Sequence, residues 1–157
     1  MSQKKYSKIK KRRRGTAIVE TEKGILVTAG RGRVFILPGG GAGKHETRTE
    51  AAMRELREET GLKPYYAKYL FHHTGRVHES HGHGYFQDHH TVCLIKARGT
   101  PSPRHEVKHI AYYKSGSGVR ISGVTREIIE KYYAYKKRSR IRQEQTSILN
   151  RLFEWFT

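Results

Sequence analysis

The sequence has a single cysteine and no long apolar run. One cysteine excludes a disulfide within the chain and fits a reducing compartment. Cys93 lies in the apolar run 92–95, which favours a buried structural thiol over a catalytic one. No apolar run reaches the roughly 18 residues of a transmembrane helix. The basic N-terminus is also not followed by the apolar segment of a secretory signal. We therefore expect a cytoplasmic protein without a membrane span.

Acidic residues are scarce, and basic residues are clustered. The 157-residue chain has 32 lysines and arginines but only 14 aspartates and glutamates, a formal net charge of +18. Residues 1–14 include eight basic residues and no acid, and a second basic cluster lies within 131–142. Such clusters attract polyanions, so a nucleic acid is a candidate partner for residues 1–14. The same composition also suits a flexible solubilising tail. We expect a flexible arm over residues 1–14; the alternative is an additional edge strand or a cover over the substrate pocket.

The order of apolar runs and turn residues predicts one α/β domain of the α+β type. Strands are expected over 16–20, 24–28, 34–37, 65–75, 84–97 and 110–113, with a glycine loop at 38–43 and a His-rich loop between the two longest strands. Thr47 or Thr49 is expected to cap a helix that runs to about Thr60, with Gly61 after its end. A second helix is expected from near Thr125. The domain is predicted over 15–138, followed by an amphipathic helical tail over 139–157.

Three of the scarce carboxylates share one face of the first helix. Glu55, Glu58 and Glu59 lie three and four residues apart, and the Glu55–Glu59 pair of like charges costs roughly 0.2–0.5 kcal/mol. A divalent cation would offset this repulsion, and Mg²⁺ prefers carboxylate oxygens together with substrate phosphate oxygens. The alternative is an ordinary solvated face, because Arg54 lies four residues from both Glu50 and Glu58.

The segment around these carboxylates resembles the Nudix box. Residues 40–62 read GGAGKHETRTEAAMRELREETGL, which fits the order Gly, five residues, Glu, seven residues, Arg-Glu-apolar, one residue, Glu-Glu, one residue, Gly-apolar. The nine matching positions are Gly40, Glu46, Arg54, Glu55, Leu56, Glu58, Glu59, Gly61 and Leu62.

The resemblance implies a Nudix-like mixed β-sheet sandwiched between helices. It also implies a pyrophosphohydrolase that cleaves the diphosphate bond of a nucleoside diphosphate linked to another group, with Mg²⁺ as cofactor and Mn²⁺ as a substitute. The partner would then be a phosphorylated small-molecule substrate. The competing hypothesis is a Nudix-fold module that binds RNA or another polyanion with little catalysis.

The resemblance also implies a role for each residue of the box. Glu58 and Glu59 would be metal ligands, and Glu55 would be a ligand or the base that orients water. Arg54 and Glu46 would form an ion pair that fixes the helix against the preceding loop.

Further candidate ligands lie at and beyond the start of the box. The backbone carbonyl of Gly40 would approach the metal, where a side chain would obstruct it. Glu106 is the first candidate for a fourth carboxylate, with Glu79 and Asp88 as alternatives. The His-rich stretch 72–90 has neither a Cys-x-x-Cys nor a His-Glu-x-x-His frame. We therefore interpret it as a mobile loop that contacts substrate, rather than as a zinc site.

Overall fold

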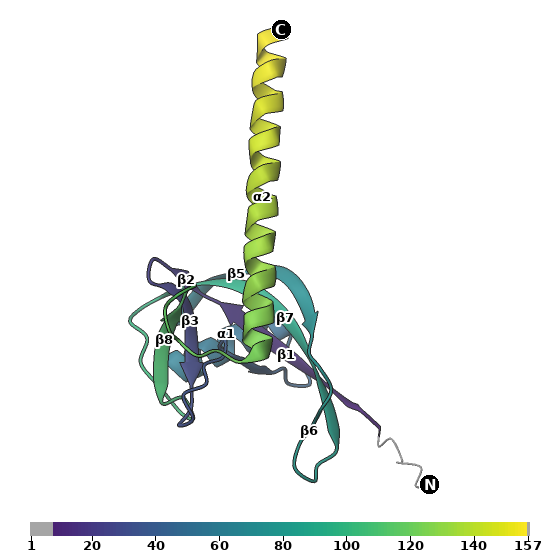
Figure 1. The fold of residues 1–157 in the computed structure, drawn as a ribbon, viewed down its shortest axis with the longest axis vertical. Helices are drawn as coiled ribbons and strands as arrows, with labels where there is room; N and C mark the ends of the chain where they lie inside the picture. Colours follow the sequence, from purple (N-terminus) through teal and green to yellow (C-terminus); the bar gives the residue numbers. More distant parts are fainter. Residues whose placement is uncertain (1–7, 157) are drawn as a thin grey trace.

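The computed structural model describes residues 8–156 (Figure 1). None of the helices in this part of the chain combines the length and apolar character that crossing a membrane requires. The elements, in chain order, are β1 (Lys10–Ile18), β2 (Glu20–Thr21), β3 (Gly24–Ala29), β4 (Gly39–Gly41), α1 (Arg48–Thr60), β5 (Lys63–Thr74), β6 (His78–Glu79), β7 (Tyr85–Arg98), β8 (His109–Tyr113) and α2 (Gly123–Phe156).

The strands form two sheets. The larger has the order β4-β1-β7-β5, with β6 paired to β7, and the smaller has the order β2-β3-β8. Strands β1 and β7 are parallel, whereas the other pairs within both sheets are antiparallel. The expected mixed sheet and α+β class are therefore confirmed.

Two apolar cores lie on opposite faces of the strands, one under each helix. Successive residues of a strand point to opposite faces, so Ala17 packs with α1 residues such as Leu56, whereas Ile18 packs with α2 residues such as Ile128. Cys93 is fully buried in the core beneath α1, as its apolar neighbours predict. The helices therefore sandwich the strands, and α2 continues far beyond them (Figure 1).

The structure corrects three sequence predictions. Residues 10–14, expected in a flexible arm, belong to β1, where their backbone pairs with residues 86–90 of β7; residues 1–7 lie outside the described part of the chain. The strand expected over 34–37 is reduced to two isolated bridges, whereas glycines 39–41, expected in a loop, form β4 against β1. Helix α2 also runs through residue 138, where the boundary between domain and tail is expected, and this continuity does not test the boundary. The division into domains itself stays a prediction.

Candidate active site

Helix α1 is fixed at both ends by local interactions. The Thr47 hydroxyl accepts the Glu50 backbone N–H, and the Glu50 carboxylate accepts the Thr47 N–H, a complete capping box. Gly61 ends the helix in the left-handed region at φ 72°, which a residue with a side chain rarely adopts. Leu56 is fully buried beneath the helix. This anchoring sets the direction in which the neighbouring glutamates point.

Arg54 links the loop before α1 to two glutamates of the helix. Its Nε donates to Glu46 Oε1 at 2.7 Å, and Nη2 donates to Glu46 Oε2 at 3.1 Å, so the ion pair expected from the box is present and is bidentate. Nη1 donates to Glu55 Oε1 at 2.9 Å and to Glu58 Oε2 at 3.1 Å. Nη2 also donates to the carbonyl of Gly41 in β4. The hydrogen bonds from Arg54 lower the pKa of Glu46 to about 2. One guanidinium thus binds the carboxylates of Glu46, Glu55 and Glu58 and fixes their relative positions.

Glu55 lies directly over Gly40. A Cβ atom added at Gly40 would lie 2.2 Å from Glu55 Oε1, well inside van der Waals contact. At the next residue, Gly41, an added Cβ would have no atom within 4 Å. The close approach of β4 to this carboxylate therefore requires glycine at position 40 alone.

Glu59 is the most unusual carboxylate of the group. It is only 6% exposed, and its Oε2 is buried without a hydrogen-bond partner. Burial and the negative charges of Glu55 and Glu106 raise the pKa of Glu59 to about 8, although the Gly39 N–H and the charge of Arg14 oppose the shift. A buried carboxylate with a free oxygen is costly unless something positive compensates it.

These carboxylates fit a divalent cation by chemistry, although they do not enclose one. The negative charge of Glu106 contributes to the raised pKa of Glu59, so Glu106 lies near this carboxylate; its role as a fourth ligand stays a prediction. The alternative Glu79 is in β6, and Asp88 is paired with Arg12. Within residues 8–156, no three His, Cys, Asp or Glu side chains converge into a metal site by themselves. Mg²⁺ commonly takes only one or two carboxylates and completes its shell with water and phosphate oxygens. The set therefore fits a cation that binds together with substrate.

A pocket of about 650 Å³ adjoins the carboxylates. Gly39, whose N–H donates to Glu59, and Arg14, whose charge acts on Glu59, also line this pocket. The remaining lining comes from β1, β7, the segments at 36–37 and 75–78, and the start of α2: Arg12, Thr16, Ile36, Leu37, Gly75, Arg76, His78, Asp88, His90, Ser122, Gly123, Val124, Thr125, Glu127 and Ile128. The pocket therefore approaches Glu59 at Gly39 and Arg14, although none of the glutamates of the box lines it.

The polar side chains of the pocket are held by cross-strand pairs. Arg12 donates to both oxygens of Asp88, with Nε to Oδ1 at 2.6 Å and Nη2 to Oδ2 at 3.0 Å. His90 Nδ1 lies 2.9 Å from the hydroxyl of Thr16. Burial, followed by the positive charge of Arg14, lowers the pKa of His90 to about 4, so its imidazole is neutral at pH 7. The pocket wall thus includes the Arg12–Asp88 ion pair, the guanidinium of Arg14 and the neutral imidazole of His90.

Sequence reasoning does not find these pocket residues. It predicts Arg12 and Arg14 in a flexible arm, although they alternate with Thr16 in the period of two that marks one face of a strand. The stretch 72–90 is not all loop, because its histidines at 72, 73, 89 and 90 are paired residues of β5 and β7, within the strands expected over 65–75 and 84–97. Only the segment 75–84, which includes β6, connects these two strands. The alternation is visible in the sequence, whereas the pairing partner is not.

The comparisons with known proteins agree with this geometry. The sequence matches the family model of the NUDIX domain over residues 10–117. A structure from Chromobacterium violaceum assigned to the Nudix hydrolase family is 32% identical; the match covers 94% of this chain and 97% of that one, with a TM-score of 0.65. No curated protein matches the sequence.

More distant structures share the fold. A MutT NUDIX hydrolase from Burkholderia pseudomallei is 20% identical, with 77% of this chain and 97% of that one covered and a TM-score of 0.62. A bifunctional NMN adenylyltransferase/ADP ribose pyrophosphatase from Francisella tularensis, complexed with AMP and a Mn ion, is also 20% identical. That match covers 79% of this chain but only 41% of the longer protein, with a TM-score of 0.55.

Proposed function

This chain is a pyrophosphohydrolase of the Nudix family, and we propose that it hydrolyses the diphosphate bond of a nucleoside diphosphate linked to another group, with Mg²⁺ at Glu55, Glu58 and Glu59. The observation that carries the proposal is the state of Glu59. Its Oε2 is buried without a partner beside two other carboxylates, which is unfavourable until a cation arrives. The Francisella structure, which is complexed with a Mn ion, supports a divalent metal in this fold.

We assign metal binding and proton acceptance to the carboxylates of the site. Glu58 and Glu59 would hold the cation with Glu55, and Glu106 would join them from the segment between β7 and β8. When bound, the cation withdraws charge from the diphosphate and lowers the pKa of an attacking water. A carboxylate of the set accepts the proton of that water.

The ion pairs of Arg54 limit how far Glu55 and Glu58 can move during the reaction. Arg54 ties both side chains, and the loop that carries Glu46, to one guanidinium. Hydrolysis of this kind depends mainly on positioning and electrostatics and needs no covalent nucleophile. Arg54 and Glu46 therefore act as positioning residues, and Gly40 leaves the space in which Glu55 lies.

The pocket supports a nucleotide derivative as the substrate. Its volume of about 650 Å³ lies in the range of small-molecule sites. Arg12, Arg14 and Arg76 line it, and guanidinium groups match the geometry of phosphate oxygens. The phosphates would lie near Arg14 and Gly39, where the pocket approaches Glu59, and the rest of the substrate would extend towards the start of α2.

A substrate panel tests the proposal. Purified protein is incubated with nucleoside triphosphates, ADP-ribose, dinucleoside polyphosphates and triphosphorylated RNA in Mg²⁺, and released phosphate or nucleotide is measured. Glu59→Gln should lower kcat at least about 100-fold, since it removes the charge of a metal ligand. The matched control is Glu22→Gln, which removes one charge in the exposed turn between β2 and β3 and should leave kcat unchanged.

A stability measurement separates a lost ligand from a lost fold. In EDTA at pH 7, Glu59→Gln should unfold at a higher temperature than the wild type. Burial raises the pKa of Glu59 to about 8, so folding must protonate this side chain, whereas an amide is neutral in both states. Added Mg²⁺ should raise the Tm of the wild type but not of the variant. Full activity in a folded Glu59→Gln protein would reject the assignment. Tight RNA binding without turnover of any substrate would favour the binding module instead.

A further inference from the structure

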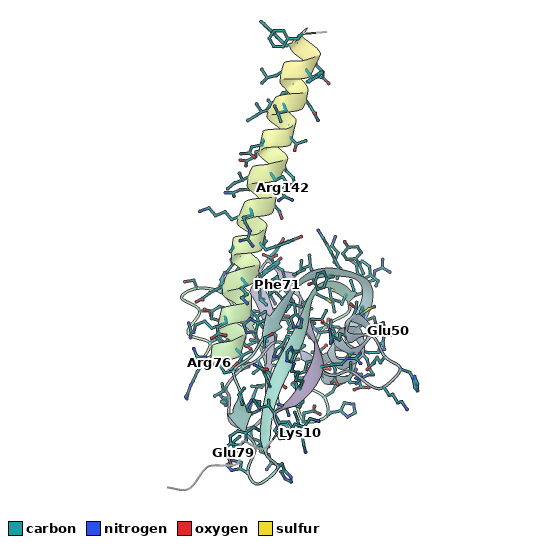
Figure 2. The ribbon with its side chains drawn as sticks, turned by 90° about the vertical axis from the view of Figure 1, so that its right-hand side faces the viewer. Lys10, Glu50, Phe71, Arg76, Glu79 and Arg142 are labelled. Carbon is teal, nitrogen blue, oxygen red and sulfur yellow. The ribbon has the colours of Figure 1, made fainter. Side chains whose placement is uncertain are left out.

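The last half of α2 projects from the body with its apolar side chains uncovered. Tyr132 is the last buried residue of the helix, and every residue from 140 to 156 is exposed. Ile148 and Leu152 are each 51% exposed, and Trp155 is 87% exposed. Figures 1 and 2 show this part of α2 extending alone beyond the sheets.

The exposed side chains follow a heptad pattern. Ile141, Gln145, Ile148, Leu152 and Trp155 are spaced alternately by four and three residues, the a/d seam of a coiled coil, with Gln145 as its one polar member. Leu149 and Phe156 lie beside this seam at the e positions. A lone helix of this length is only marginally stable in water, so the pattern indicates a second helix against this face.

We propose that residues 138–156 pair with the same segment of a second copy of this chain, as an antiparallel two-helix coiled coil that makes the protein a homodimer. The proposal is independent of the hydrolytic site, since no residue of the segment lines the pocket.

The distribution of charge favours a second copy, in the antiparallel orientation. Residues 141–156 have two arginines and two glutamates, so their net charge is zero and two such segments do not repel each other. Residues 131–140, in contrast, have five basic residues and no acid. A parallel pair would place these basic stretches side by side, whereas an antiparallel pair places them at opposite ends.

The flanking residues also fit the antiparallel orientation. Glu144 and Arg151 both occupy g positions, and g faces g in an antiparallel pair. When Gln145 is opposite Ile148 of the partner subunit, Glu144 lies beside Arg151 of the partner subunit, and the two-fold axis repeats this contact. In a parallel pair Glu144 would instead face an apolar leucine. Among the residues that the structure describes, the one ion pair of Glu144 is a loose one with Arg140, at 3.8 Å and largely exposed, which leaves Glu144 able to bind across the interface.

The segment is large enough for such an interface. Its 19 residues span about 28 Å of helix. Each copy contributes six large apolar side chains, two of them aromatic: Ile141, Ile148, Leu149, Leu152, Trp155 and Phe156. Because one aromatic side chain buries roughly 150–250 Å², two copies bury on the order of 1,000 Å², the size at which specific interfaces begin.

Sedimentation equilibrium of the full chain from about 1 to 200 µM tests the dimer. The wild type should fit a monomer–dimer equilibrium, and Leu152→Asp should weaken association at least about 30-fold, since it places a charge in the seam. The matched control is Ser147→Asp, which adds the same charge at a c position away from the seam and should dimerise normally. Circular dichroism and kcat per chain should be the same in both variants. A monomeric wild type, or a dimer that survives Leu152→Asp, would overturn the proposal.

A charge exchange tests the orientation. Glu144→Arg and Arg151→Glu should each weaken the dimer, and the double variant should restore it, because the antiparallel contact is then re-formed in reverse. A double variant no tighter than the single variants would refute the antiparallel register. The alternative occupant is a membrane surface. A wild type that is monomeric in solution and sediments with vesicles of phosphatidylcholine and phosphatidylserine would overturn the dimer in its favour.

Discussion

The sharpest prediction concerns two adjacent glycines of β4. Gly40→Ala should strongly reduce hydrolysis, whereas Gly41→Ala should not. The Cβ of alanine at position 40 would lie 2.2 Å from Oε1 and 2.4 Å from Cδ of Glu55, whereas the one at position 41 would contact nothing within 4 Å. Neither glycine has a positive φ, so alanine fits the backbone at both sites.

The size of the effect follows from the overlap. Van der Waals contact begins near 3.4 Å, so the Glu55 carboxylate must move by about 1 Å. A displacement of this size in a catalytic group costs on the order of 100-fold in rate. Stability should change by less than about 1 kcal/mol, because the colliding atoms are the end of a flexible side chain and alanine restricts the unfolded chain.

The assay is kcat/KM on the best substrate of the panel in Mg²⁺, together with urea unfolding of each variant. Gly40→Ala is expected to be folded and nearly inactive, and Gly41→Ala folded and active. If Gly40→Ala keeps its activity within about threefold, Glu55 is not needed at its position over β4. If Gly41→Ala is equally impaired, the cause is β4 as a whole and not the carboxylate.

Three further predictions concern other parts of the molecule. Burial holds the pKa of His90 near 4, below its usual 6.5, so only the unfolded chain takes up this proton between those values. Stability should therefore fall by up to about 3 kcal/mol as the pH drops from 6.5 to 4, and His90→Gln should flatten the slope of urea midpoint against pH. The Tyr132 hydroxyl donates to the Glu20 carboxylate and joins α2 to β2, so Tyr132→Phe should cost about 1–2 kcal/mol in urea unfolding, with the exposed Tyr133→Phe as a near-neutral control. Deleting residues 2–7 should leave kcat on a small nucleotide unchanged. The deletion should also reduce the slope of log binding constant against log salt concentration for single-stranded RNA, by about 0.7 for each phosphate that these residues neutralise. An unaltered slope would remove the case for the arm as an RNA-binding segment.

The parts of the fold that depend on short-range chemistry were predictable from the sequence. The capping residues and the C-terminal glycine locate α1, and the alternation of apolar residues locates most of β5 and β7. The fixed spacing of the box also places Arg54 within reach of Glu46, because both positions belong to one loop and helix.

The parts that depend on long-range pairing were not predictable. Arg12 and Asp88 are 76 residues apart, and only the parallel register of β1 on β7 brings them together. The apolar segment 34–37 has the composition of a strand but pairs through single bridges, while three glycines with low strand propensity pair with β1. In both segments, contacts with distant parts of the chain determine the secondary structure, rather than local strand propensity.

The distribution of acidic residues explains how the proposed cation site is compatible with a strongly basic chain. A net charge of +18 favours anions everywhere on the surface, so a cation can be bound only where carboxylates are concentrated and shielded from the surrounding lysines and arginines. Arg54 is the basic residue among these glutamates, and its ion pairs reduce their mutual repulsion in the absence of a metal. Two of the pocket arginines, Arg12 and Arg14, lie on β1, and Arg76 lies between β5 and β6, where they would attract the phosphates of a substrate. A cation and a phosphorylated substrate would therefore stabilise each other's binding, and we expect Mg²⁺ to bind more tightly when a non-hydrolysable nucleotide is present. Equal Mg²⁺ affinity with and without the nucleotide, measured by calorimetry, would contradict this coupling.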